Sequence, residues 1–236
     1  MPNRILVICA HHDDEVLGCG ATIKKLTASG HEVGVLILGE GTTARATTTR
    51  MELERLKNNH LQALEVLGAK SIECDVPIRK TDLGHFTNTL PDNRFDTVPL
   101  LKIVQMVERV IDEFKPNTIY SHTTHDLNID HRITAQAVLT ATRPLPGQTV
   151  KELYAFEVMS STEYSFNQFE LFRANTYVDV TEHFKSKLDA IRCYEDELRA
   201  FPHPRSLQAL EAWGAVRGSQ VGVEYGEAFE LIRAIK

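Results

Sequence analysis

The chain has 236 residues, of which 42% are hydrophobic, which is enough apolar material for one large or two small domains. Its formal net charge of −6 argues against nucleic acid as the main partner. The four cysteines lie far apart with no Cys-x-x-Cys pair, which indicates reduced thiols rather than disulfides or a zinc ribbon. No stretch approaches the roughly 20 apolar residues that span a bilayer, and the first apolar run is too short for a signal peptide. We therefore expect a cytoplasmic globular protein without stable membrane insertion.

The first two-thirds of the chain alternate predicted strands with predicted helices. Short apolar runs predict strands over residues 5–9, 31–38, 71–74 and 117–120. Apolar residues at helical spacing predict helices over residues 16–28, 50–67, 99–115 and 133–142, with Asp130 placed to cap the last one. A helix that joins two strands of one sheet forms a right-handed unit with parallel strands. We therefore expect a doubly wound, mainly parallel α/β sheet.

After residue 145 the regular alternation of predicted strands and helices ends. The later elements are predicted as strands over 152–158 and 176–180, a long helix from Thr181 to about 198, and one or two helices within 207–235. An irregular loop is expected over residues 77–97. We predict a single α/β domain over residues 1–236, with a core at 1–145 and a carboxy-terminal elaboration at 146–236.

Two polar clusters follow directly on predicted strands, at residues 11–15 and 121–132. In a doubly wound sheet of order 3-2-1-4, the first and fourth strands are neighbours, and ligands bind at their carboxyl ends. Five side chains are therefore expected to lie within reach of one another: His11, Asp13, Asp14, Asp130 and His131.

The residue types in these clusters favour a catalytic metal site. Two imidazoles and one carboxylate leave a four-coordinate Zn²⁺ with an open position for water. Because Asp13 and Asp14 are adjacent, one can bind the cation while the other takes a proton from that water, whose pKa zinc lowers to roughly 7. Asp130 is placed to fix the tautomer of a liganding histidine. The pattern predicts a water-activating hydrolase that acts on an amide or ester carbonyl.

Two motifs stand at these clusters: Ala-His-His-Asp-Asp-Glu at residues 10–15, and an Asp-His pair that opens a helix at Asp130-His131. They resemble the motifs of the zinc-dependent N-acetylglucosaminyl-phosphatidylinositol de-N-acetylase (PIG-L, or LmbE-like) family, in which proline usually stands at the position of His12. The resemblance implies a Rossmann-like fold with sheet order 3-2-1-4-5, a homo-oligomer, and removal of an N-acetyl group from an acetamido sugar or sugar conjugate by a zinc-activated water.

The resemblance also assigns roles to residues. It implies one Zn²⁺ per chain, with another divalent cation such as Fe²⁺ as the alternative, held by His11, Asp14 and His131. It implies Asp13 as the catalytic general base. Many family members carry a histidine where this chain has Asn128, which can instead donate to the oxyanion.

Four further residues are candidates for substrate contact. His122 or His125 can supply a proton, and His203 is presented rigidly between two prolines. Arg45 follows the second predicted strand and can hold a substrate hydroxyl or phosphate; its alternative interpretation is an ordinary loop arginine.

Other functions fit parts of the same pattern. Two histidines and a carboxylate also suit a non-haem iron(II) oxygenase, although that chemistry has no use for Asp13. An amidase acting on another N-acyl conjugate and a non-catalytic sugar- or nucleotide-binding protein are further alternatives. For the deacetylase, the substrate is a free sugar, a sugar nucleotide, a lipid-linked glycan or a thiol glycoside.

Overall fold

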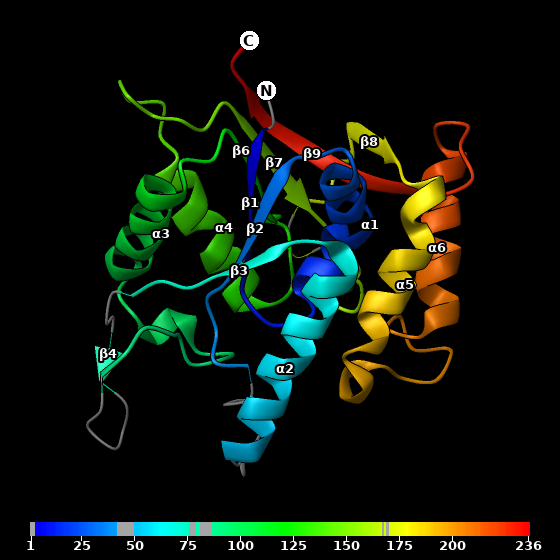
Figure 1. Ribbon diagram of the computed structural model, residues 1–236, viewed down its shortest axis with the longest axis horizontal. Coiled ribbons are helices and arrows are strands. Elements are labelled where there is room, and N and C mark those ends of the chain that lie inside the picture. The colour runs from blue at the N-terminus through cyan, green and yellow to red at the C-terminus, as the bar shows by residue number, and fades with distance from the viewer. Residues whose placement is uncertain (1–2, 42–49, 76–78, 81–85, 167, 169) are drawn as a thin grey trace.

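A seven-stranded sheet of order β3-β2-β1-β6-β7-β9-β8 runs through the centre of the computed structural model (Figure 1). The structure describes residues 3–41, 50–75, 79–80, 86–166, 168 and 170–236. Five neighbouring strands are parallel: β1 (Arg4–Cys9), β2 (Glu32–Ile37), β3 (Lys70–Ile72), β6 (Thr118–His122) and β7 (Glu152–Phe156). The predicted order 3-2-1-4-5 of a doubly wound sheet is thereby confirmed.

Strand β1 is apolar on both faces because helices cover the sheet on both sides. Residues 5–9 are at most 2% exposed, and β1 pairs with β2 on one edge and β6 on the other. Helices α3 (Leu100–Phe114) and α4 (Ile129–Ala141) cover one face (Figure 1). The other face is covered by α1 (Asp14–Ala28), α2 (Arg50–Leu67), α5 (Phe184–Arg192) and α6 (Leu207–Ser219). A buried parallel sheet therefore explains the continuous apolar runs of the sequence.

The remaining elements are short. A small antiparallel pair is formed by β4 (Arg79–Lys80) and β5 (Phe86–Thr87). Single turns of 3₁₀ helix occur at Phe95–Thr97, Glu163–Ser165, Thr181–His183 and Glu195–Glu197. None of the helices in the described part of the chain has the length and apolar character to cross a membrane.

The prediction of helices throughout residues 207–235 is wrong for its second half. Residues Gly226–Ala234 form β9, which runs antiparallel between β7 and β8 (Thr176–Asp179). The sequence hides this strand because Glu227 and Glu230, which look like exposed helix formers, are buried carboxylates. Strand pairing overrides local propensity here. Residues 146–236 thus continue the sheet begun by residues 1–145, while the single-domain organisation itself stays a prediction.

The helix predicted to start at Thr181 and to reach about residue 198 is also shorter in the structure. Helix α5 ends at Arg192, and Tyr194 leaves the helix to point inward. The Thr181 hydroxyl donates to Asp179 Oδ1 and accepts from the Tyr225 N–H, so it ties together two strand ends rather than capping α5.

A buried ion pair joins β9 and α5 to a kink in α1. The kink lies at Cys19 (φ −149°, ψ 25°). The Glu227 carboxylate accepts from the N–H groups of Ala21 (3.2 Å) and Thr22 (2.7 Å), just past the kink. Lys187 Nζ donates to Glu227 Oε1 (2.6 Å) and to the Leu17 carbonyl (2.7 Å). The pair therefore satisfies backbone groups that the broken helix leaves without regular partners.

We predict that Lys187→Met destabilises the protein by about 3–5 kcal/mol, because it leaves the buried Glu227 carboxylate without its counter-charge. Urea unfolding followed by circular dichroism measures the change. Lys185→Met is the matched control, since the Lys185 side chain is 84% exposed on the same helix. Equal stability of the two variants would contradict this account of the ion pair.

Candidate metal centre

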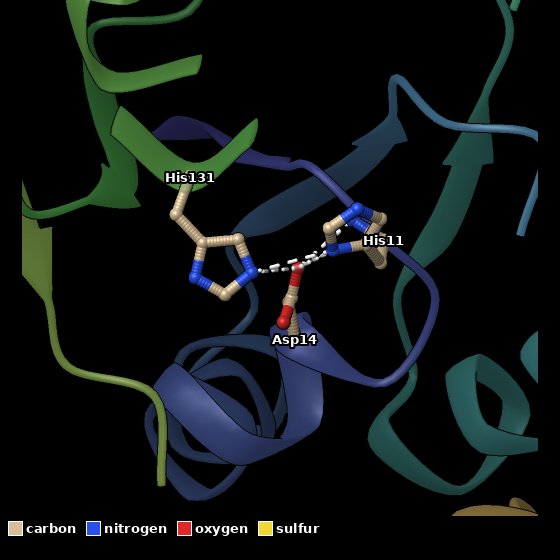
Figure 2. Close-up of side chains that lie close together, drawn as sticks. All are labelled: His11, Asp14 and His131. Carbon is tan, nitrogen blue, oxygen red and sulfur yellow. Dashed lines mark hydrogen bonds and ion pairs between the residues drawn. The ribbon is translucent and has the colours of Figure 1, made fainter. Parts of the chain in front are cut away.

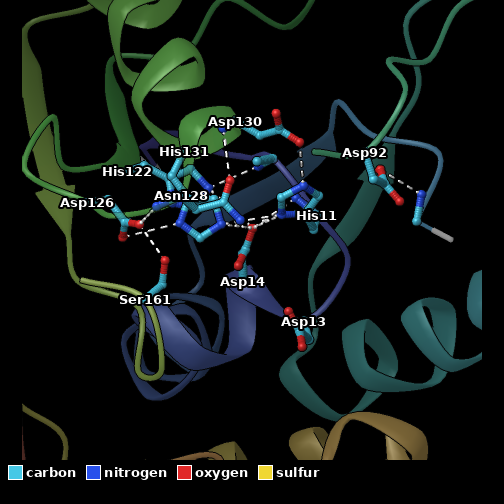
Figure 3. Close-up of polar contacts among 12 residues, drawn as sticks. His11, Asp13, Asp14, Asp92, His122, Asp126, Asn128, Asp130, His131 and Ser161 are labelled. Carbon is cyan, nitrogen blue, oxygen red and sulfur yellow. Dashed lines mark hydrogen bonds and ion pairs between the residues drawn. The ribbon is translucent and has the colours of Figure 1, made fainter. Parts of the chain in front are cut away.

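The site lies at the carboxyl ends of β1 and β6, the two neighbouring strands at the centre of the doubly wound sheet. After β1, the chain turns sharply through Asp13, which has a left-handed backbone (φ 89°). The Asp13 carbonyl accepts from the N–H groups of Val16 and Leu17 and so starts α1. This turn sends the side chains of Asp13 and Asp14 in different directions, as Figure 3 shows.

Of the five side chains that the strand order is expected to bring together, His11, Asp14 and His131 offer donor atoms within 4.8 Å of one another (Figure 2). Asp130 contacts the ring of His11. His11 Nδ1 lies 3.3 Å from His131 Nε2, and Asp14 Oδ2 lies 3.6 and 3.4 Å from these two nitrogens. In a tetrahedral zinc site with bonds of about 2.0–2.1 Å, neighbouring donor atoms are about 3.3–3.4 Å apart. The separations therefore fit a tetrahedral cation bound by three protein ligands.

Buried polar atoms in the site also fit a bound cation. Asp14 is fully buried, and its Oδ1 has no hydrogen-bond partner among the described residues. Burial lowers the pKa of His11 and His131, but the carboxylates around them outweigh this and raise the pKa values to about 10 and about 9. The site thus strongly favours positive charge, which a metal ion can supply in place of protons.

Two buried carboxylates hold the far sides of the histidine rings (Figure 3). Asp130 Oδ2 lies 2.9 Å from His11 Nε2, and Asp126 Oδ2 lies 3.2 Å from His131 Nδ1. Asp130 can accept the ring N–H of His11, and the Asp126 carboxylate makes an ion-pair contact with the His131 ring, so the opposite nitrogens can turn their lone pairs toward the same point. Burial raises the pKa of Asp126, but its contact with His131 and its hydroxyl donors lower the value to about 2.

Asp126 and Asp130 also accept hydrogen bonds that fix the positions of their carboxylates. Asp126 accepts hydrogen bonds from the hydroxyls of Ser161 and Thr162 (2.6 Å for Thr162). Asp130 accepts from the backbone N–H groups of Asn93 and Phe95 (3.0 Å for Phe95). Asp126 was not singled out from the sequence, although it stands within the polar cluster after β6.

The predicted cap of α4 is wrong. The cap is Asn128, whose Oδ1 accepts from the Asp130 N–H at 2.9 Å. Asp130 is not available for capping because its carboxylate contacts His11 and two backbone N–H groups. This arrangement leaves the amide NH₂ of Asn128 as its only side-chain donor.

Asp13 lies apart from the three candidate ligands and pairs with a residue distant in sequence. Arg205 Nη1 donates to Asp13 Oδ2 at 2.7 Å, and Arg205 Nε donates to Ser160 Oγ at 2.7 Å. Burial raises the pKa of Asp13 to about 8, with Arg205 opposing the rise and Asp14 adding to it. Arg205 was not predicted from the sequence, although it stands two residues after the candidate His203.

Of the remaining candidates, His122 lies against this centre. His122 has a fully buried side chain that stacks on His131, and its Nε2 accepts from the Ala10 N–H at 2.9 Å. This position places the His122 ring against the candidate ligand His131 and leaves none of the ring exposed. Burial and His131 lower the pKa of His122 to about 4.

Two other histidines are only half-buried. His125 donates its backbone N–H to Thr123 Oγ1, and His203 Nδ1 accepts from the Arg205 N–H. Their substrate contacts stay predictions. Arg45 lies outside the described residues.

We predict that Asp126→Asn lowers metal affinity by about 10–100-fold, because the His131 ring loses its charged acceptor. Competition with a metal-sensitive dye measures the affinity. Asp112→Asn, which changes a 76% exposed carboxylate on α3, serves as the control. Unchanged affinity in Asp126→Asn would show that Asp126 does not orient the ligand.

Comparisons with known proteins bear on this site. The sequence model of the PIG-L (GlcNAc-PI de-N-acetylase) family matches residues 6–142. The diacetylchitobiose deacetylase of Thermococcus kodakarensis is 29% identical over 240 residues, covering 98% of this chain and 84% of that protein.

Solved structures share the fold. The N,N′-diacetylchitobiose deacetylase of Pyrococcus horikoshii superposes with a TM-score of 0.73 at 19% identity, covering 98% of this chain and 84% of that one. The 4-carboxy-2-hydroxymuconate hydratase GalB of Pseudomonas putida KT2440 superposes with a TM-score of 0.68 at 21% identity, covering 99% and 98%. The likeness of these structures shows the fold alone, whereas the family match spans more than half of the sequence, both polar clusters included. This chain belongs to the PIG-L (GlcNAc-PI de-N-acetylase) family.

Proposed function

We propose that the protein is a metal-dependent hydrolase that removes the N-acetyl group from an acetamido sugar or sugar conjugate. The observation that carries the proposal is the set of three donor atoms at tetrahedral spacing, together with the separate buried carboxylate of Asp13, the residue before Asp14. Membership of the PIG-L family and the related diacetylchitobiose deacetylase support amide hydrolysis on a sugar.

His11, Asp14 and His131 would hold the cation, with one Zn²⁺ per chain as the proposed metal and Fe²⁺ as the alternative. When bound, such a cation lowers the pKa of a coordinated water to about 7 and polarises the amide carbonyl. Asp126 and Asp130 keep the two imidazole rings in the orientation that this binding needs.

Asp13 is the proposed general base. Its pKa of about 8 belongs to a site without a metal ion, and a cation held by Asp14 would favour the ionised carboxylate. The Asp13 carboxylate can then take a proton from the attacking water and return it to the leaving amine. Arg205 fixes the position of the carboxylate through its 2.7 Å hydrogen bond. The Asn128 amide is the proposed donor to the developing oxyanion.

We propose that the enzyme works in the cytoplasm. The described structure has four free cysteines, three of them buried, which supports work in the reducing cytoplasm. We propose a small N-acetylated sugar or sugar conjugate as substrate and a homo-oligomer as the assembly.

We predict that purified protein releases acetate from N-acetylated sugars, that a chelator abolishes this activity, and that added Zn²⁺ restores it. Acetate is measured enzymatically while metal content is measured by mass spectrometry on the same sample. Consumption of oxygen and a 2-oxoacid would instead favour the oxygenase. Tight sugar binding by metal-free protein without turnover would favour the binding protein.

We further predict that Asp13→Asn lowers kcat at least about 100-fold, the usual contribution of a general base, while the bound metal stays. His131→Ala should lose the metal as well as the activity, because it removes a ligand. The two variants are compared by metal-to-protein ratio and acetate release. Loss of metal in Asp13→Asn would mean that Asp13, and not Asp14, is the carboxylate ligand.

A further inference from the structure

Shortly after β7 the chain makes a tight turn over residues 158–163, which we call the 158–163 turn. The N–H groups of Ser161 (3.2 Å) and Thr162 (2.9 Å) donate to the Val158 carbonyl, and the Thr162 hydroxyl accepts from the Val158 N–H at 2.8 Å. The turn contributes neither a candidate metal ligand nor the proposed general base. Its side chains reach both of these groups through one further residue each.

On one side, the 158–163 turn holds Asp126, the carboxylate that makes an ion-pair contact with the candidate ligand His131 (Figure 3). The Ser161 hydroxyl donates to Asp126 Oδ1, and the Thr162 hydroxyl donates to Asp126 Oδ2 at 2.6 Å. Ser161 and Thr162 are only 6% and 5% exposed, so water has little access to replace either donor. The orientation of the Asp126 carboxylate therefore depends on the turn.

On the other side, the turn holds Arg205. Ser160 Oγ accepts from Arg205 Nε at 2.7 Å, and Arg205 Nη1 donates to Asp13 Oδ2 at 2.7 Å. Ser160 has a left-handed backbone (φ 71°), which is uncommon for a residue other than glycine. This residue marks the point in the turn at which the side-chain contacts change from Arg205 to Asp126. The position of Arg205, and with it that of the Asp13 carboxylate, therefore also depends on the turn.

The carboxylate of Glu163 fixes the backbone of the turn at this point. Its Oε1 accepts from the Ser160 N–H at 2.6 Å, and its Oε2 accepts from the Ser161 N–H at 3.2 Å. Hydrogen bonds to an ionised carboxylate are stronger than those between neutral groups. A single side chain thus holds the residue that contacts Arg205 and a residue that contacts Asp126.

We infer that the 158–163 turn is one positioning element for both halves of the site, the proposed base Asp13 and the candidate ligand His131, with Glu163 as its central positioning residue. The inference rests on the proposed function and adds a residue that acts on it from outside the metal centre. A general base must stay within hydrogen-bond reach of the proton that it takes. A common support for the base and the ligand keeps their separation fixed.

Two measurements on each variant test the inference. Competition with a metal-sensitive dye gives the Zn²⁺ affinity, and acetate release from N-acetylglucosamine at saturating Zn²⁺ gives kcat and KM. Thr162→Val removes a donor to Asp126 and should weaken Zn²⁺ binding about three- to tenfold, the effect of one lost hydrogen bond. Thr162→Ser keeps the hydroxyl and should restore the affinity.

Ser160→Gly removes the acceptor of Arg205 and should lower kcat about three- to tenfold, with KM and Zn²⁺ affinity unchanged. Glycine suits the left-handed backbone, so this variant should unfold at the same urea concentration as the wild type. A fall in kcat without a loss of stability separates positioning from a merely structural role.

Glu163→Gln should weaken Zn²⁺ binding and lower kcat together, because an amide has one acceptor oxygen where the carboxylate uses two. Glu170→Gln is the matched control, since the Glu170 side chain is 68% exposed a few residues further along the same segment. A Glu163→Gln variant that changes neither quantity, or only one of them, would overturn the inference. A wild-type kcat in Ser160→Gly would overturn it as well.

The same data separate this inference from the proposed function. Weaker Zn²⁺ binding in Glu163→Gln, without acetate release from N-acetylated sugars by the wild type, would reject the deacetylase and uphold the link between the turn and the metal centre. Acetate release by the wild type, with Zn²⁺ affinity and kcat unchanged in Glu163→Gln, would reject the inference alone.

Discussion

The buried carboxylate of Asp14 is the group on which the rest of the site depends. It lies between the ring nitrogens of three histidines: His11 (3.6 Å), His122 (3.4 Å) and His131 (3.4 Å). Burial by itself raises the pKa of Asp14. The attraction between its carboxylate and the three histidines is larger and keeps the pKa well below its usual value. A negative charge is thus held where water is excluded, and this arrangement is stable only with positive charge close by.

The fold creates this arrangement because β1 and β6, which are far apart in the sequence, are neighbours in the sheet. His11 and Asp14 follow β1, and His131 follows β6, more than 100 residues later. Because β1 and β6 are parallel neighbours whose helices leave toward opposite faces, their carboxyl ends lie side by side at one edge of the sheet. The same scaffold can carry more than one reaction, so the chemistry depends on the side chains at this edge rather than on the sheet. The carboxylate of Asp13, set apart from the candidate ligands by the left-handed turn, is therefore what points to hydrolysis.

The parts of the molecule that could be predicted from the sequence are those marked by a pattern of neighbouring residues. Continuous apolar runs predicted the parallel strands. The strand order then predicted that five side chains would lie near one another, and three of them, His11, Asp14 and His131, do so as candidate ligands. The partner of Asp13 could not be found in this way, because Arg205 lies 192 residues further along the chain. Strand β9 was missed because its buried glutamates are paired through tertiary contacts, which periodicity does not record. Asp130 contacts the ring of the candidate ligand His11, but it does not cap the helix as the sequence analysis expected.

The central claim is that two distant polar clusters form one metal site, and anomalous X-ray diffraction at the zinc absorption edge tests it most directly. In crystals of protein loaded with one equivalent of Zn²⁺, the account predicts a single strong anomalous peak about 2.0–2.2 Å from His11 Nδ1, His131 Nε2 and an Asp14 oxygen. A peak at another place on the molecule, or no peak between these three residues, would contradict it.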